Sequence, residues 1–186
     1  MNSLRLATVA VLLLTAAAVP AAQSSPARAF TGLTLIDGTD RAPVANATIV
    51  VRDGLIVAAG PAASVSIPPG AARVALDGKT VMPGLINAHG HVNDPRDLQV
   101  YAAYGITTVF SLGGEQASVF AARASQATPA LDRARVFVSG PVLTPQTPDE
   151  ARAQVANVVA QRVDFVKIRV DDNLGATPKM APEVYR

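Results

Sequence analysis

Residues 81–92, which read VMPGLINAHGHV, contain the only two histidines of this 186-residue chain, His89 and His91. In an extended strand, side chains two positions apart point to the same face. Both imidazoles would then lie on one side, with Ala88 and Gly90 on the other. Two imidazoles on one strand form half of a chelate for a metal such as zinc. A chance His-x-His pair on a surface loop is the alternative, but because the pair follows an apolar run, we favour the metal site.

The chain after this motif alternates between helical and strand patterns. A capping box, in which Thr147 precedes Pro148 and Glu150, predicts the start of one helix. The predicted order is helix 95–104, strand 106–111, helix 117–127, strand 135–139, helix 148–162, strand 164–170 and the start of a helix at 181–186. Such alternation predicts an α/β fold with a parallel sheet, in which active groups lie at the carboxyl ends of the strands.

The chain before the motif has the pattern of a small sheet. Its predicted strands are residues 30–36, 47–52, 55–59 and 73–76. An Asp-Gly pair between apolar runs is typical of a tight turn, because both residues tolerate a positive φ. We therefore predict an antiparallel sheet over residues 29–80 with a structural role. The turns account for Asp37, Asp53 and Asp77 without any catalytic function.

The N-terminus has the pattern of a secretory signal peptide, with Arg5 followed by an apolar run and then small residues. The apolar run is shorter than the roughly 20 residues that span a bilayer. We expect cleavage near Ala21 or Ala22, with an uncleaved membrane anchor as the alternative. The predicted location is periplasmic or secreted, without stable membrane insertion after cleavage. The predicted domains are a signal peptide (1–22), a small β-sheet domain (23–80) and a third segment (81–186).

The composition is that of a globular protein, with 49% hydrophobic and 16% charged residues. The net charge is +2, and no basic block interleaved with aromatic residues is present, which argues against a nucleic-acid partner. The chain has no cysteine, so its stability depends on packing without disulfides. A small-molecule substrate is the expected partner, and the oligomeric state stays open, including a homo-oligomer.

Lys167 is the second residue of interest, because it lies within the apolar strand predicted at 164–170. A bare ammonium group is costly in such a strand unless it has a partner. The alternation places Lys167 on the same face as Phe165 and Arg169. One interpretation is an ion pair with Asp164 or Asp171, or a side chain that extends to solvent. The other is a carbamylated lysine that bridges two metals.

Residues 81–91 closely resemble the first-strand motif of the amidohydrolase superfamily, in its imidazolonepropionase-like branch. The sheet module before the motif is similar to the composite small domain of these enzymes. Residues 104–109, 139–145 and 164–168 resemble the segments of the second, third and fourth strands. The resemblance implies about the first four β/α units of a TIM (β/α)8 barrel, preceded by a small β-sandwich-like composite domain.

The resemblance also implies a site and a reaction. His89 and His91 would bind the more buried metal, and a carboxylated Lys167 would bridge to a second. The implied cofactor is a divalent metal, with zinc expected and two ions in the complete enzyme. A metal-bound hydroxide would hydrolyse a C–N bond in an amide, lactam, cyclic amidine or dipeptide.

Three further polar residues have less specific interpretations. Asn87 stands where many members have Asp, and it either orients the motif or caps the backbone at the strand end. For Asp171 and Asp172, we favour solvated loop charge over substrate contact. The substrate-binding residues are not identified by the sequence.

The chain departs from the family after the fourth strand segment. Family members take further histidines from the fifth and sixth strands and a catalytic Asp from the eighth, whereas this chain ends at Arg186. Residues 81–186 are about half of a barrel of roughly 250 residues. We therefore expect an N-terminal fragment that is inactive alone, with the general acid/base Asp beyond Arg186. The alternatives are half of a split enzyme, a catalytically inactive exported remnant, or a binding module.

Overall fold

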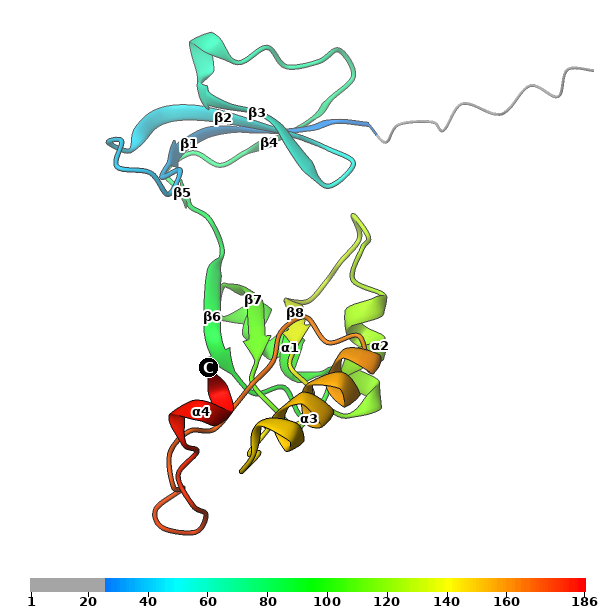
Figure 1. Cartoon of the computed structure of the whole chain (residues 1–186). Helices are drawn as coiled ribbons and strands as arrows, with labels where there is room; N and C mark the ends of the chain where they lie inside the picture. Colours follow the sequence, from blue (N-terminus) through cyan, green and yellow to red (C-terminus); the bar gives the residue numbers. More distant parts are fainter. Residues whose placement is uncertain (1–25) are drawn as a thin grey trace, which may run out of the picture.

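The computed structural model describes residues 26–186, so the predicted signal peptide lies outside the described residues. Figure 1 shows a small sheet joined to an α/β unit by the segment between β5 and β6. No helix within residues 26–186 is long and apolar enough to cross a membrane. The sheets combined with helices confirm the predicted α/β fold.

The small sheet has five strands. They are β1 (Arg28–Leu35), β2 (Val44–Arg52), β3 (Leu55–Pro61), β4 (Ala72–Ala75) and β5 (Thr80–Val81), and a short 3-10 helix, η1 (Ala62–Ser64), follows β3. The order is β3-β2-β1-β4, and β5 also pairs with β1. The predicted hairpin at Asp53-Gly54 is present, with φ of 51° and 77°, values that suit its tight turn.

The prediction of a purely antiparallel sheet is wrong, because β4 and β5 both run parallel to β1. The reason lies in the connection after β3. The chain passes through η1 and a loop before it reaches β4 on the far side of β1, and such a crossover permits parallel pairing. Alternating polarity within short strands does not distinguish the two directions.

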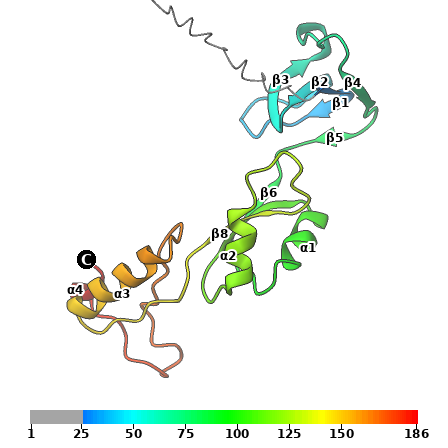
Figure 2. The same cartoon turned by 90° about the vertical axis from the view of Figure 1, so that its right-hand side faces the viewer.

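The α/β unit contains a parallel sheet in the order β6-β7-β8. Its elements are β6 (Leu85–Gly90), α1 (Asp97–Ala103), β7 (Ile106–Ser111), α2 (Ala117–Ala124), β8 (Arg135–Val138), α3 (Pro148–Ala160) and α4 (Pro182–Tyr185). Helices α1 and α2 pack on the sheet, whereas α3 and α4 contact each other (Figure 2). The core between sheet and helices is formed by buried aliphatic side chains, among them Leu98, Val109, Val119, Val136 and Val138.

Two helix ends follow the expected local chemistry. The Thr147 hydroxyl accepts a hydrogen bond from the Glu150 N–H at 3.2 Å, and Pro148 is the first residue of α3. The Glu150 carboxylate in turn accepts from the Gln146 N–H at 2.8 Å. After α1, Gly105 adopts a φ of 79°, which ends the helix before β7 begins.

The strand predicted at 164–170 is not formed. The segment is linked to its neighbour by a single parallel bridge between Leu143 and Ile168. The Leu143 N–H donates to the Lys167 carbonyl at 2.9 Å, and the Arg169 N–H donates to the Leu143 carbonyl at 3.0 Å. Gly140, at a φ of 71°, and Pro141, which lacks an N–H, turn the chain after β8. Residues 164–170 therefore have no neighbouring strand with which to form a continuous ladder of hydrogen bonds.

Candidate metal centre

The histidine motif lies at the carboxyl end of β6, where Gly90 is the last strand residue and His91 follows it. A Cβ at Gly90 would lie 2.6 Å from Val109 Cγ1, so only glycine permits this close approach of β6 to β7. The His89 N–H donates to Asn87 Oδ1 at 3.1 Å. Asn87 thus caps the backbone of the motif, as one of its two interpretations predicts.

The two imidazole rings lie side by side. Their centroids are 5.9 Å apart, and the ring planes are inclined at 53°. Both side chains are exposed and line one cavity, in agreement with the alternation expected for an extended segment. Gly90 faces Val109 on β7 and Tyr101 on α1. Because neighbouring residues of a strand point to opposite faces, His89 lies on the face of the sheet that points away from α1.

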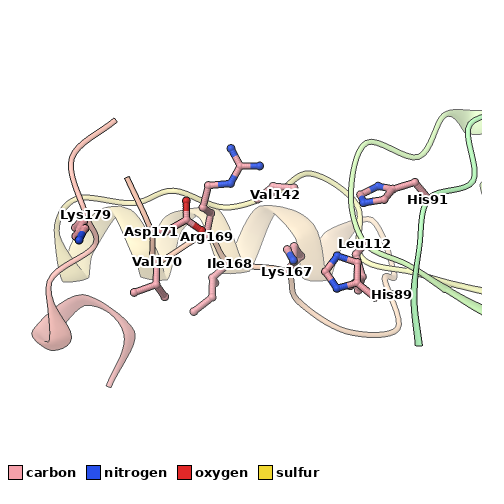
Figure 3. A pocket seen from close by; sticks show the side chains of 10 residues that line it. All are labelled: His89, His91, Leu112, Val142, Lys167, Ile168, Arg169, Val170, Asp171 and Lys179. Atoms are coloured by element: carbon pink, nitrogen blue, oxygen red, sulfur yellow. The ribbon is translucent and has the colours of Figure 1, made fainter. Parts of the chain in front are cut away.

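The cavity has a volume of about 770 Å³ and opens at the carboxyl ends of the parallel strands. Figure 3 shows the ten side chains around it. They come from the ends of β6, β7 and β8 and from the segment after α3: His89, His91, Leu112, Val142, Lys167, Ile168, Arg169, Val170, Asp171 and Lys179. The structure therefore brings His89, His91 and Lys167 to one cavity, although 76 positions separate Lys167 from His91.

Lys167 belongs to the more covered face of its segment. Phe165, Lys167 and Arg169 are half-buried, whereas the apolar side chains between them are each 39% exposed. The Phe165 ring lies 5.7 Å from that of Phe110 on β7, which in turn stacks at 5.2 Å on Phe137 of β8. The aromatic contacts fix the side of the segment that faces the sheet, and Lys167 projects from that side into the cavity.

The ion pairs considered for Lys167 are not formed. Asp164 pairs with Arg123, and the Asp171 carboxylate accepts from the Asn173 N–H at 2.8 Å. Within residues 26–186, the Lys167 ammonium has neither an ion pair nor a hydrogen bond. Its side chain is thus available to a ligand in the cavity.

The two neighbouring aspartates, Asp171 and Asp172, differ in their position relative to the cavity. Asp171 lines it, whereas Asp172 lies 3.9 Å from the Lys179 ammonium. In the part of the chain that the structure describes, no group of three or more His, Cys, Asp or Glu side chains is arranged to hold a metal. Among the described residues, the imidazoles of His89 and His91 are therefore not joined by a third His, Cys, Asp or Glu ligand.

Two residues near the site had no predicted role. Glu115 joins the loops after β7 and β8, since its carboxylate accepts from the Gly113 N–H at 3.0 Å and from the Gly140 N–H at 2.9 Å. These loops carry Leu112 and Val142 to the cavity wall. Arg169 also lines the cavity. The sequence could have indicated this only because Arg169 is two positions after Lys167 and therefore lies on the same face of an extended segment.

No protein-family model matches the chain, and a search of curated proteins gave no match. Solved structures do match. A candidate prolidase from Bifidobacterium longum is 30% identical, with a TM-score of 0.68 over 78% of this chain and 41% of that one. A molinate hydrolase is 27% identical, with a TM-score of 0.57 over 75% of this chain and 37% of that one.

A third structure supports the fold alone. A Xaa-Pro dipeptidase with methionine in its active site is 18% identical, with a TM-score of 0.62 over 77% of this chain and 47% of that one. The chain thus spans less than half the length of each of these three proteins. These neighbours are members of the amidohydrolase superfamily, and the similarity of this chain to them in sequence and fold supports its assignment to that superfamily.

Proposed function

We propose that the chain contributes one wall of the metal centre of an exported, metal-dependent hydrolase of C–N bonds. The observation that carries the proposal is the convergence of His89, His91 and Lys167 on one cavity at the carboxyl ends of parallel strands. The two more similar structures support it, since one is a prolidase candidate and the other is a molinate hydrolase. Zinc is the proposed metal, with two ions in the complete enzyme.

The ring geometry is compatible with a shared ion. A histidine nitrogen lies about 2.0–2.1 Å from zinc, which places the ring centroid about 3.2 Å from the ion. Two rings that share one ion therefore have centroids no more than about 6.4 Å apart. The observed 5.9 Å lies inside this limit.

Within this proposal, each residue has a defined task. A bound divalent metal would activate water and polarise the carbonyl of the scissile bond. His89 and His91 would hold the first ion, and Asn87 keeps the strand end in place through its bond to the His89 N–H. Lys167 would bridge to a second ion once carboxylated, because the resulting carboxylate supplies oxygen donors.

The proposed architecture follows the same lines. We propose that β6, β7, β8 and the segment around Ile168 are the first four strand positions of a (β/α)8 barrel. They are ordered in sequence and parallel, and the bridge from Leu143 to Ile168 continues that order. The strands β1–β5 would form the composite domain. The branch of the superfamily, cleavage near Ala21 or Ala22, and a periplasmic or secreted location stay proposals from the sequence.

A non-catalytic binding module is the second candidate. The observation that favours it is the lack, within residues 26–186, of any group of three His, Cys, Asp or Glu side chains arranged for a metal. Two imidazoles and an amine bind metal more weakly than a complete set of ligands. One half of a split enzyme would also lack metal ligands until the second half was present.

Metal binding tests the proposal directly. Zinc should bind the full chain weakly in calorimetric titrations, and the H89N/H91N double variant should lose that binding. Asp172→Asn is the matched control, because the Asp172 carboxylate lies 3.9 Å from the Lys179 ammonium and is not among the side chains that line the cavity. Equal zinc affinity of the double variant and the unmodified chain would show that the histidine pair is not a metal site.

A further inference from the structure

Arg169 lies in the same cavity as the histidine pair, two positions after Lys167 (Figure 3). Because the segment is extended here, the side chains of Lys167 and Arg169 leave it on the same side. Arg169 is about 7 Å further along the chain, toward its carboxyl end. Arg169 therefore lines the same cavity as the proposed metal ligands and lies nearer than Lys167 to the carboxyl end of the segment.

The guanidinium of Arg169 has no partner in the part of the chain that the structure describes. Within residues 26–186 it forms no ion pair and donates no hydrogen bond, although Asp171 lines the same cavity. Asp171 instead accepts from the Asn173 N–H. By contrast, Arg123 and Arg152 each pair with a carboxylate. The Arg169 side chain is half-buried and lines the cavity, and no group among residues 26–186 pairs with its guanidinium.

The charge around the cavity is predominantly positive. Three cationic side chains line it, those of Lys167, Arg169 and Lys179, against the single carboxylate of Asp171. Lys179 is already close to Asp172 at 3.9 Å. Carboxylation of Lys167 would replace its positive charge with a negative one, which would leave Arg169 and Lys179 as the cationic side chains of the lining. Positive potential in a concave site favours an anionic ligand.

We propose that Arg169 binds a carboxylate group of the substrate, so that the substrate class is that of dipeptides and N-acyl amino acids with a free carboxylate near the scissile C–N bond. The planar guanidinium fork matches a carboxylate with two parallel hydrogen bonds. The scissile carbonyl would lie by the histidine pair, and the carboxylate would point toward the mouth of the cavity. This inference rests on the proposed hydrolase function for its reaction, and it separates acidic substrates from neutral lactams.

Binding of two matched probes tests the inference. N-acetyl-L-alanine carries the free carboxylate, and N-acetyl-L-alanine methylamide replaces it with an uncharged amide. Calorimetry or NMR titration of the full chain should show at least about tenfold tighter binding of the carboxylate, as expected for a charge-assisted pair. Arg169→Met should abolish that preference and leave the affinity for the methylamide unchanged. Zinc content, measured in parallel, should be the same in both proteins.

Two further variants make the result specific. Lys179→Met removes one positive charge from the same cavity wall but should keep the preference, because Lys179 is held near Asp172. Arg169→Lys keeps the charge and the aliphatic stem, so it remains informative if Arg169→Met does not fold. We expect the lysine to weaken carboxylate binding several-fold, since it lacks the planar fork.

The outcomes separate this inference from the metal proposal. A carboxylate preference that disappears in Arg169→Met supports the inference even if the chain binds no zinc. Equal affinity for both probes in the unmodified chain would overturn it, whatever the zinc content. It would also be overturned by a preference that persists unchanged in both Arg169 variants.

Discussion

Asp164 forms an ion pair with Arg123, which lies 41 positions earlier in the chain. The other oxygen of the same carboxylate accepts the Val138 N–H at 2.9 Å. The Asp164 backbone N–H in turn donates to the Val138 carbonyl at 2.9 Å. One residue thus connects α2, the end of β8 and the segment that carries Lys167, and it holds this segment in place where no strand ladder does.

Replacement of Asp164 should therefore destabilise the fold. The Asp164 side chain is only 17% exposed, and Asp164→Ala leaves the Val138 N–H without its side-chain acceptor and Arg123 without its partner. We expect a loss of about 1–3 kcal/mol in the free energy of unfolding, measured in urea. Asp149→Ala is the control, because its pair with Arg152 is largely exposed and should contribute less than about 1 kcal/mol. Equal losses in the two variants would contradict the role of Asp164.

Substitution of Gly90 should affect both stability and the histidine pair. In Gly90→Ala the new methyl would lie 2.6 Å from Val109 Cγ1, so β6 must move away from β7. Overpacking of this kind costs about 1–3 kcal/mol. Thermal unfolding and zinc titration should both show a loss. Ala88→Ser, at an exposed position of the same strand, should leave both unchanged.

The cap of α3 gives a sharper stability test. Thr147→Ala removes the hydroxyl that accepts from the Glu150 N–H, and we expect a loss of about 1 kcal/mol. Thr147→Ser keeps the hydroxyl and should lose far less. If both variants unfolded at the same urea concentration, the hydroxyl would not be the stabilising group.

The loop after the histidine motif should show a shifted titration. Hydrogen bonds from the Arg96 side chain, and then from its backbone N–H, lower the pKa of Asp94 below the usual carboxyl range. A lowered pKa means that the carboxylate stabilises the loop above the ordinary carboxyl pKa. This stabilisation is lost as the pH falls through the lowered value.

NMR titration of the side-chain carboxyl signals checks this prediction. Arg96→Gln should raise the pKa of Asp94 part of the way toward its ordinary value, since the backbone N–H still donates. Asp37, whose pKa is lowered chiefly by its hydrogen bonds with Thr39, should titrate as before and serves as the internal control. An unchanged pKa of Asp94 in the variant would contradict the assigned cause.

Features that depend on neighbouring residues were predictable from the sequence. Strand β7 has the predicted bounds, because a β-branched run is enclosed between Gly105 and Leu112. The start of α3 follows from Thr147 and Pro148. The histidine pair is likewise local, and two residues on one short segment necessarily lie close together.

Features that depend on distant partners were not predictable. The pattern at 164–170 is that of a strand, but the ladder fails because Pro141 and Gly140 turn the neighbouring chain. The direction of β4 depends on the crossover after β3. No carboxylate among residues 26–186 pairs with the Arg169 guanidinium, and a sequence pattern does not record the absence of a distant partner.

The two bonds of Leu143 fix Lys167 and Arg169 together. The Leu143 N–H donates to the Lys167 carbonyl, and the Leu143 carbonyl accepts from the Arg169 N–H, so both side chains belong to one tripeptide that is bonded to Leu143 at each end. A displacement of Leu143 would therefore move the side chains of Lys167 and Arg169 together. Changes in the loop beyond Asp171 can alter the mouth of the cavity while the spacing between these two cations stays constant.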